Sequence, residues 1–434
     1  MQIVDHSHPQ LCAKIRDRIL AEPSQRIPFA AFMEMALYDP EYGYYATNYV
    51  NIGSSGDFYT APHLGADFGE LLAEQFAEMW ARLNYPNPFT LVEIGAGQGL
   101  LVRDILRYLH RHHDACFDAV EYVVVEQSAA LVAQQQQRMA KLVASFERLH
   151  WRTWDEIAID SIVGCLFSNE LVDALPVHWV TQQDGQLKEI YVTLADATEK
   201  PLVTSAPMEM EVDLSALWYG APAIAPVYSS TQFAEVLAEP STPELQRYFS
   251  VTGIDFPSAA YCQGYRTEVN LAALDWMQTV ASRLRRGYVL TIDYGYLAQR
   301  YYLPSRSGGT LQCYYQHQYH SNPYIHVGRQ DITAHVNFSA LQQQGDRHEL
   351  ETLGFTQQGL FLMALGMGDR IANISQLVPD EKFTVADILA RREGLHSLIH
   401  PNSLGGFGVL IQGKGLEPQM KVLKGLQTPE LNLE

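Results

Sequence analysis

The segment LVEIGAGQG, residues 91–99, places three glycines directly after an apolar run and decides the fold of this chain. The residues that follow, LLVRDILRYLH at 100–110, repeat apolar side chains at helical spacing. Glycine lets the backbone turn sharply and approach a ligand closely, while the first N–H groups of a helix offer hydrogen-bond donors. The order of strand, glycine turn and helix therefore predicts a ligand-binding turn of an α/β fold.

The spacing of Gly95, Gly97 and Gly99 separates two classes of nucleotide-binding turn. The dinucleotide fingerprint has glycine at its sixth place, where this chain has Leu100. The G-x-G-x-G spacing with the acidic Glu93 before it is typical of S-adenosylmethionine enzymes, whose ligand brings a ribose and an amino acid moiety. We therefore expect Glu93 and the three glycines to bind that ligand, and a nicotinamide-dependent oxidoreductase is disfavoured.

The segments beyond the turn alternate between strand and helix patterns. Apolar runs at 121–126, 161–169 and 287–295 suit strands covered on both faces, and SAALVAQQQQRM at 128–139 has helical spacing. This alternation predicts a parallel sheet. We expect an α/β chain with a doubly wound Rossmann-like core of the class I methyltransferase type, a helical N-terminal prefix and a large inserted cap.

Five segments follow from these patterns. The segment VHWVTQQDGQLKEIYVTL at 177–194 predicts a hairpin, and the runs FTQQGLFLMAL and GFGVLIQG near the end predict late strands. We divide the chain into a helical prefix with the loop GDFYTAP (1–87), a first part of the core (88–194), an inserted cap (195–275), the remainder of the core (276–415), which contains a Tyr- and His-rich insertion at about 300–338, and a tail (416–434).

Charge and cysteine content narrow the partners and the compartment. The chain has 30 Lys and Arg against 49 Asp and Glu, a net charge of −19, which repels nucleic acids and anionic membranes and favours basic partners. The alternative is that an acidic surface only keeps the protein dispersed.

Five scattered cysteines form neither a disulfide framework nor a zinc signature, so we expect reduced thiols. The start MQIVDHSHPQ lacks a targeting pattern and no membrane span is found, so we expect a cytoplasmic protein.

An acidic residue follows the second strand of the pattern. Glu126 lies one βα unit after the glycine turn, where a carboxylate can accept hydrogen bonds from both ribose hydroxyls. The alternative is that it caps the helix beginning near Ser128, because acids are stabilised at helix starts. With the glycine turn before it, we assign Glu126 to ribose binding.

Several long motifs in one order resemble the MidA-like methyltransferase family. They are FMEMALYDPEYGYY, GDFYTAP, VEIGAGQGLLVRDIL, SNELVDALPVHWV, IDYGY, GTLQCYYQHQYH and GRQDITAHVNF, and the resemblance spans about 25–412. The family includes the mitochondrial complex I assembly factor that acts on an arginine of a respiratory complex subunit. The resemblance implies a Rossmann-like core, S-adenosyl-L-methionine as donor and a basic protein acceptor. Unlike the mitochondrial members, this chain shows no Arg-rich presequence, so we expect a member that is not imported.

Acids beside the transferred methyl would suit an arginine acceptor. A guanidinium stays protonated, with a pKa above about 12, and a carboxylate can bind it through two hydrogen bonds and aim one nitrogen. The motif SNELVDALP supplies Asn169 at a strand end, then Glu170 and Asp173, whose spacing predicts one face of a helical turn. We assign the two acids to the acceptor and Asn169 to orienting donor or acceptor. The alternative is that the acids only stabilise a short helix.

Weaker candidates complete the site. We expect Asp57 to close over the donor, and Asp293, Tyr294 and His178 to line the acceptor pocket, although a buried, hydrogen-bonded histidine is the commoner case. The histidines of HRHH at 110–113 suit the end of a helix, and we assign no metal site.

Two other functions stay open beside arginine methylation. One is a small-molecule methyltransferase whose oxygen or nitrogen acceptor is selected by the cap. The other is a non-catalytic assembly factor that keeps the fold and binds a partner. The intact glycine turn, Glu126 and N-E-x-x-D pattern argue against lost chemistry.

Overall fold

The computed structural model describes residues 5–47, 60–195, 230, 232–316, 318–374 and 384–427. The chain forms two compact units, and each takes segments from distant parts of the sequence. Unit 1 draws on 1–58, 172–276 and 295–343, and unit 2 draws on 59–171, 277–294 and 344–434.

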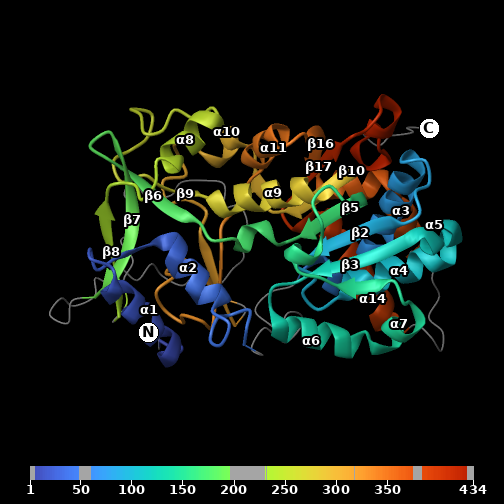
Figure 1. The fold of residues 1–434 in the computed structure, drawn as a ribbon, viewed down its shortest axis with the longest axis horizontal. Helices are drawn as coiled ribbons and strands as arrows, with labels where there is room; N and C mark the ends of the chain where they lie inside the picture. Colours follow the sequence, from blue (N-terminus) through green and yellow to red (C-terminus); the bar gives the residue numbers. More distant parts are fainter. Residues whose placement is uncertain are drawn as a thin grey trace. The chain divides into compact units, whose positions relative to one another are not determined.

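Unit 2 contains a sheet of seven strands among the described residues, in the order β16-β17-β10-β5-β2-β3-β4. Strands β10, β5, β2, β3 and β4 pair in parallel, whereas β17 and β16 are antiparallel. Strands from distant parts of the chain therefore lie side by side (Figure 1). Their bounds are Phe89–Ile94 (β2), Val120–Val125 (β3), Leu149–Trp151 (β4), Ile162–Asn169 (β5), Leu284–Asp293 (β10), Glu351–Gln357 (β16) and Gly408–Lys414 (β17).

Helices connect and cover these strands, which confirms the doubly wound α/β core. Helix α4 buries the apolar face that begins at Leu101 and ends at Leu109, and it packs against α3 in the core around Phe76 and Phe167. The α-helices are Asp67–Arg82 (α3), Leu100–His112 (α4), Asp114–Ala119 (α5), Ala129–Arg138 (α6), Ala140–Ser145 (α7), Gln358–Ala364 (α12), Met367–Ile374 (α13) and Val385–Ile399 (α14). The 3₁₀ helices are Ala61–Leu64 (η1), Trp154–Glu156 (η2), Leu404–Gly406 (η4), Pro418–Lys421 (η5) and Lys424–Leu426 (η6).

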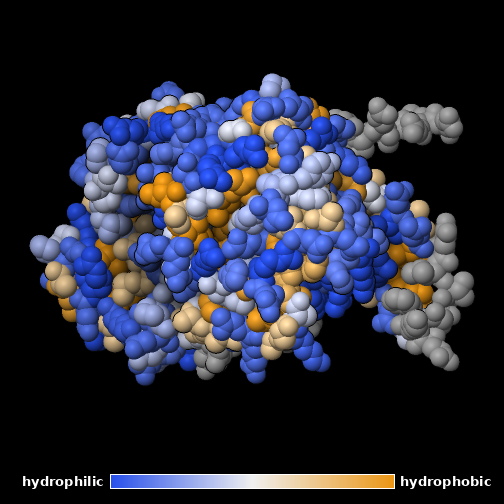
Figure 2. Space-filling model, turned by 45° about the vertical axis from the view of Figure 1, so that its right-hand side comes forward, coloured by the Kyte–Doolittle hydropathy of each residue, from blue (hydrophilic) through white to orange (hydrophobic). Residues whose placement is uncertain are grey.

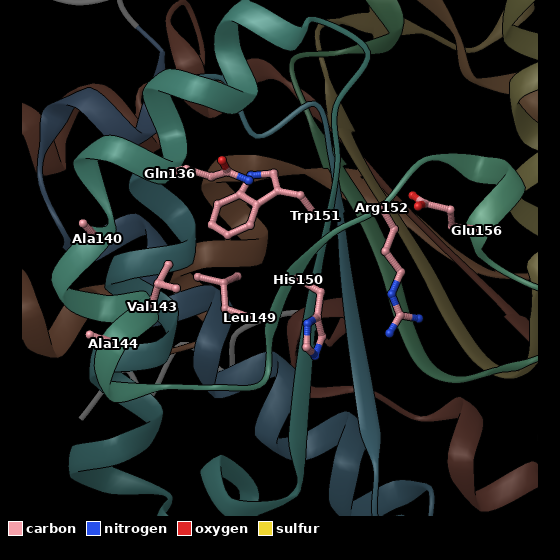
Figure 3. Close-up of a pocket in the computed structure, with 9 residues that line it drawn as sticks. All are labelled: Gln136, Ala140, Val143, Ala144, Leu149, His150, Trp151, Arg152 and Glu156. Atoms are coloured by element: carbon pink, nitrogen blue, oxygen red, sulfur yellow. The ribbon is translucent and has the colours of Figure 1, made fainter.

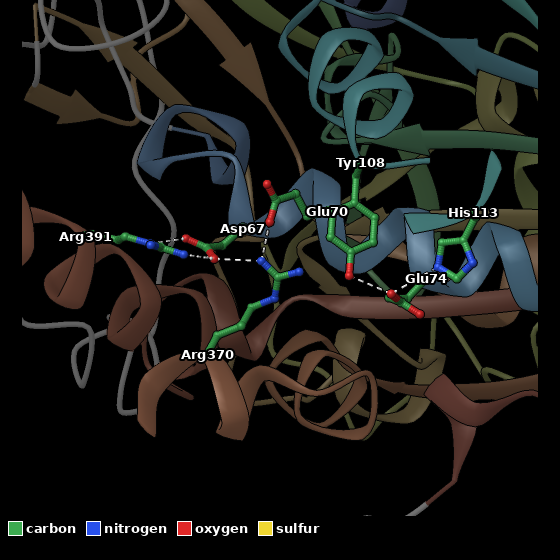
Figure 4. Close-up of polar contacts among 7 residues, drawn as sticks. All are labelled: Asp67, Glu70, Glu74, Tyr108, His113, Arg370 and Arg391. Carbon is green, nitrogen blue, oxygen red and sulfur yellow. Dashed lines mark hydrogen bonds and ion pairs between the residues drawn. The ribbon is translucent and has the colours of Figure 1, made fainter. Parts of the chain in front are cut away.

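Ion pairs on the buried carboxylate of Asp67 join α3 to the C-terminal helices α13 and α14, whose arginines are partly exposed (Figure 4). Asp67 accepts hydrogen bonds from Nε and Nη2 of Arg391, both at 2.8 Å, and from Nη1 of Arg370 at 2.8 Å. Arg370 also pairs with Glu70 of the same helix. Two-pronged arginine–carboxylate pairs fix orientation as well as supplying energy. These contacts hold the C-terminal helices to the core of unit 2.

Unit 1 contains a five-stranded antiparallel sheet among its described residues, and α1 and α2 pack on it. Its core includes Trp179, Phe29, Phe32 and Tyr324, all fully buried. The sheet strands are Ile27–Pro28 (β1), His178–Gln183 (β6), Gln186–Leu194 (β7), Phe233–Ala238 (β8) and Arg266–Val269 (β9). The other strands are Gly295–Tyr296 (β11), Gln312–Tyr315 (β12), Gln318–His320 (β13), Asp331–Thr333 (β14) and Val336–Asn337 (β15).

The helices of unit 1 are short apart from α1. They are Pro9–Ala21 (α1), Phe29–Tyr38 (α2), Glu244–Val251 (α8), Ala298–Tyr301 (α10) and the 3₁₀ helix Val172–Ala174 (η3). Helices α9 (Leu271–Arg283) and α11 (Phe338–Arg347) contain residues of both units.

Most of the predicted elements are present. The hairpin at 177–194 is confirmed as β6 and β7, and the buried run at 161–169 ends as β5 at Asn169. The late strand predicted over 355–365 is wrong after Gln357, because GLFLMA forms α12, whose Phe361 and Leu362 are buried in the core. A short apolar run does not distinguish a strand from a buried helix by periodicity alone.

The compact units divide the chain differently from the predicted segments 1–87, 88–194, 195–275, 276–415 and 416–434. The hairpin β6–β7, which we placed in the core, belongs to unit 1, as does the insertion near 300–338. The physical reason is the sheet of β1, β6, β7, β8 and β9, which joins the prefix to the cap. Of the predicted cap, only residues 195, 230 and 232–275 are described.

The surface is largely hydrophilic on the face shown in Figure 2, with smaller hydrophobic areas between. Within the described ranges, no helix is long and apolar enough to span a membrane. All five cysteines lie in the described ranges and are free thiols.

Two glycines allow β2, β5 and β10 to approach closely in the middle of the sheet. A Cβ atom at Gly164 would lie 2.1 Å from the Thr90 carbonyl oxygen, and one at Gly287 would lie 1.9 Å from that of Gly164. Both neighbours are backbone atoms of buried strands and have little freedom to move.

We predict that Gly287→Ala lowers the free energy of unfolding by at least about 1–3 kcal/mol, the range of an overpacked core. Gly308→Ala is the matched control, because a Cβ there meets no atom within 4 Å. Urea denaturation of both variants measures the difference. Equal stability of Gly287→Ala and wild type would contradict this account of the close approach.

Candidate active site at the carboxyl ends of the strands

The register of the parallel strands brings distant residues to one edge of the sheet. Ile94 of β2 pairs with Val125 of β3 and with Ser168 of β5, and Asn169 pairs with Ile292 of β10. The strands therefore end at the same level, where ligands bind in open α/β sheets. The predicted site residues that follow or end these strands are Gly95, Glu126, Asn169, Glu170, Asp293 and Tyr294.

The glycine turn has the backbone conformation that its sequence predicts. Gly95, Gly97 and Gly99 have φ angles of 71°, 50° and 73°. Residues other than glycine rarely adopt this left-handed region of the backbone. The N–H of Gly95 donates to the carbonyl of Val125 at 2.9 Å, and a Cβ at Gly95 would lie 2.6 Å from Leu171. Gly99 caps the start of α4. The turn is thus held close to both neighbouring strand ends.

Glu93 is buried below the turn rather than exposed to solvent. It is 3% exposed and accepts a hydrogen bond from the hydroxyl of Tyr122 at 2.5 Å. Burial raises the pKa of Glu93 from 4.5 to about 7, the Tyr122 hydrogen bond opposes this, and the charge of Glu126 adds to the rise. Two carboxylates therefore share this edge of the sheet.

Glu126 makes contacts that bear on both of its predicted roles. Its Oε1 accepts the N–H of Ser128 at 3.0 Å, as an acid at the start of α6 would, and its Oε2 lies 3.4 Å from Nε2 of Gln135. Ser128 is the N-cap of α6, and its own hydroxyl accepts the N–H of Leu131. Burial raises the pKa of Glu126, although these hydrogen bonds oppose the rise. The helix start thus orients the carboxylate at the end of β3.

Asn169 and Glu170 form a hydrogen-bonded pair at the end of β5. Asn169 Nδ2 donates to Glu170 Oε1 at 3.1 Å, and the N–H of Ala61 donates to the same oxygen at 3.2 Å. Asn169 Oδ1 is buried and has no hydrogen-bond partner among the described residues. A buried acceptor of this kind needs a partner, which a ligand with an N–H group can supply.

The predicted shared helical face of Glu170 and Asp173 is wrong. Glu170 has φ +51° and precedes η3, so it lies outside any helical turn, whereas Asp173 lies within η3. The boundary between the two units also falls between them. Such a left-handed residue at a strand end is the kind of strained position that clusters at functional sites.

Asp173 belongs to a polar region of unit 1. It is 5% exposed, and its main-chain carbonyl accepts the N–H of Ala334 at 2.9 Å. Burial raises the pKa of Tyr45, and the carboxylates of Asp331 and Asp173 raise it further. Tyr45 donates to Asp331 Oδ1 at 2.9 Å.

Asp293 supports the chain after β5. It is fully buried, and its oxygens accept the N–H of Leu171 at 3.2 Å and that of Tyr294 at 2.9 Å. The Tyr294 ring packs against Phe407, with centroids 5.4 Å apart. The observed contacts of Asp293 are structural, and acceptor binding by Asp293 and Tyr294 stays a prediction.

The other candidates lie elsewhere. His178 Nδ1 lies 2.8 Å from the buried carboxylate of Glu189 within the β6–β7 hairpin of unit 1, which is the commoner, structural case. Asp57 lies outside the described residues. No group of three or more His, Cys, Asp or Glu in the described ranges is arranged to hold a metal ion.

A groove of about 690 Å³ is lined by β4, the last strand of the sheet that the described residues form, and by α7. Ala140, Val143 and Leu149 line one side of the strand, and His150 and Arg152 line the other (Figure 3). Its lining contains none of the predicted site residues, so we do not assign it to the candidate site.

Sequence reasoning missed Gln135, which contacts both the glycine turn and Glu126. Its run of four glutamines suggested only a helix. The available signal is its place four residues after Leu131 and four before Met139, both buried, which puts Gln135 on the inner face of α6.

Comparisons with known proteins agree with this geometry. Residues 71–356 match a family of S-adenosyl-L-methionine-dependent methyltransferases. The mitochondrial protein arginine methyltransferase NDUFAF7 homologue of Drosophila melanogaster is 27% identical over 422 residues, which cover 92% of this chain and 84% of that protein. The human protein of this name is 25% identical, over 80% of this chain and 71% of its own length. A crystal structure from Burkholderia thailandensis with S-adenosyl-homocysteine bound has a TM-score of 0.76 and 28% identity, and covers 96% of this chain and 94% of its own.

The strand-end residues fit S-adenosyl-L-methionine, the cofactor of that family. Glu126 offers a carboxylate for ribose hydroxyls, and the buried Oδ1 of Asn169 is an acceptor for an ammonium group. The glycine turn and the start of α4 supply N–H donors.

Glu93 should make stability depend on pH. Because its folded pKa of about 7 lies above the ordinary value of 4.5, the native state holds a proton that the unfolded chain releases. The free energy of unfolding should therefore fall as pH rises between these values, on the order of 1–3 kcal/mol. Urea denaturation of wild type and Glu93→Gln across this range measures the effect. We expect the fall to be smaller in Glu93→Gln, and an identical pH dependence in both proteins would refute it.

Replacing Glu126 should weaken donor binding. Glu126→Gln keeps the shape but removes charge-assisted hydrogen bonds to ribose hydroxyls, each worth about 1.5–3 kcal/mol, so the Kd for S-adenosylhomocysteine should rise about ten- to hundredfold. Glu147→Gln, on the exposed segment after α7, removes the same charge and should leave the Kd unchanged. Calorimetric titration measures both values. An unchanged Kd in folded Glu126→Gln would remove this residue from the donor site.

Proposed function

We propose that this chain, which belongs to the family of S-adenosyl-L-methionine-dependent methyltransferases, transfers the methyl group to an arginine side chain of a protein. The observation that carries the proposal is the position of Glu170 at the carboxyl end of β5. Its carboxylate is oriented by Asn169 and Ala61, and the next residue, Leu171, lies against Gly95 of the glycine turn. The relatives named above as protein arginine methyltransferases support the same acceptor.

The chemistry requires an aimed nitrogen. When bound, S-adenosyl-L-methionine supplies a methyl group whose bond to sulfur breaks as the bond to the acceptor nitrogen forms. Glu170 binds the guanidinium through two N–H groups and holds one nitrogen in line, because positioning is the main contribution a protein makes to such a displacement. The proton lost from the methylated nitrogen passes to the carboxylate or to water.

Asn169 has a positioning role in this proposal. Its amide N–H group donates to Oε1 of Glu170 and so orients the carboxylate, and its own buried carbonyl oxygen can accept a hydrogen bond from an N–H group of the ligand. Asp173 is the second acid that we assign to the acceptor. That assignment rests on the sequence resemblance and on its surroundings of buried carboxylate and tyrosine in unit 1.

The acceptor in this proposal is a basic protein segment. The net charge of −19 favours basic partners over nucleic acids. A respiratory complex subunit is the specific candidate that the resemblance of the sequence supports. We propose the cytoplasm as the compartment, because the five scattered cysteines form no disulfide framework. The competing proposal is a small-molecule acceptor. The two are distinguished by whether a methylated peptide or a methylated small molecule is lost in cells that lack the protein.

Glu170→Gln should slow methyl transfer without weakening the binding of the methyl donor. The variant removes the charge that pairs with the guanidinium, so single-turnover methylation should fall about ten- to hundredfold, with the Kd for S-adenosylhomocysteine nearly unchanged. Mass spectrometry of arginine-methylated peptides, in cells lacking the protein and complemented with wild type or Glu170→Gln, identifies the acceptor and measures the loss.

Asp173→Asn tests the second acid separately. The melting temperature of each variant is the control for folding, because a residue that only stabilises a 3₁₀ helix would lower stability and leave turnover normal. Full methylation by either variant would remove that residue from the acceptor site. Unchanged arginine methylation in cells lacking the protein would overturn the proposed acceptor.

A further inference from the structure

Helix α6 contacts the glycine turn through two hydrogen bonds, and the residue after the helix lies close to the same turn. Gln135 Nε2 donates to the carbonyl of Gly97 at 2.8 Å, and Arg138 Nη1 donates to Gln98 Oε1 at 2.6 Å. A Cβ at Gly99 would lie 2.7 Å from the Cε of Met139. The last turn of α6 and Met139, which follows it, therefore lie against the glycine turn.

Gln135 differs from its neighbours in the glutamine run. It is 0% exposed, whereas Gln136 and Gln137 are exposed to solvent. A buried amide stays stable only when its donors and acceptor are satisfied. Gln135 meets this condition through hydrogen bonds to Gly97, Glu126 and Trp151.

The contacts of Gln135 link three elements. Its Nε2 donates to the Gly97 carbonyl and lies 3.4 Å from Glu126 Oε2, and its Oε1 accepts the indole N–H of Trp151 at 2.8 Å. Trp151 is the last residue of β4. Because the indole can only donate, it fixes which end of the amide faces the turn. The N–H groups of Gln135 are thereby aimed at Gly97 and Glu126.

We propose that Gln135 is a positioning residue for donor binding: it holds the glycine turn and the ribose-binding carboxylate of Glu126 in one fixed arrangement, and Trp151 sets its orientation. The amide carries no charge, and its N–H groups tie the carbonyl of Gly97 and Oε2 of Glu126 to the same side chain. Preorganisation of this kind reduces the free energy that binding must spend on ordering. The residue acts through Gly97 and Glu126 and need not touch the ligand.

The test uses the glutamine run as its own control. Gln135→Glu keeps size and shape but replaces the N–H donors with a carboxylate beside Glu126, so the Kd for S-adenosylhomocysteine should rise about tenfold or more. Gln137→Glu introduces the same charge two residues away on the exposed face and should leave the Kd within about twofold of wild type. Calorimetry of the full chain measures both values, and circular dichroism confirms folding.

A second variant keeps the proposal testable if Gln135→Glu unfolds. Trp151→Phe retains most of the ring packing but removes the indole N–H that orients Gln135, so donor affinity should fall about three- to tenfold in a folded protein. In a double-mutant cycle with Gln135→Leu, the two losses of donor affinity should be non-additive, because both act through one amide. A purely structural role would lower the melting temperature of the variants and leave the Kd of the folded fraction unchanged. That result, or additive losses, would overturn the proposal.

Discussion

The parallel register of β10, β5, β2 and β3 is the constraint on which the site depends. Because the strands end at one level, a glycine turn, a ribose-type carboxylate and an Asn–Glu pair from separate segments become neighbours. The register is tight because Gly164 and Gly287 bring three strands closer together than any side chain would allow. A shift of one residue would exchange the faces of a strand and move its terminal side chain away from the edge.

The electrostatics of this edge favour a particular kind of ligand. Glu93 is buried with its hydroxyl partner Tyr122, Glu126 is partly buried beside it, and the charge of Glu126 helps to raise the pKa of Glu93. A ligand that carries positive charge relieves this repulsion, and interactions are stronger where water is excluded. S-adenosyl-L-methionine, with its sulfonium and ammonium groups, matches that requirement, whereas the pyrophosphate of a dinucleotide would oppose it.

The sequence predicted the parts of the site that depend on local pattern. Gly95, Glu126, Asn169 and Asp293 lie at or just after strand ends as predicted, because apolar runs mark the buried strands and where they end. The relation of Glu170 to Asp173 was not predictable from their spacing, because spacing reveals a helical face only if the backbone is helical, and the left-handed φ of Glu170 breaks that rule. Gln135 was missed for a different reason: a run of glutamines looks like a solvated helix until tertiary contacts show which one is buried.

The interleaving of the two units is also a tertiary property. Strand pairing between β1 and β7, and between β6 and β9, joins segments that no periodicity connects. The central claim is that the donor binds where the strands of unit 2 end. Hydrogen–deuterium exchange of the wild-type chain with and without S-adenosylhomocysteine tests it most directly. The account predicts ligand-dependent protection of peptides that cover 94–100, 126–139 and 168–171. Saturable binding with no protection of these peptides, or protection confined to the groove beside β4, would contradict it.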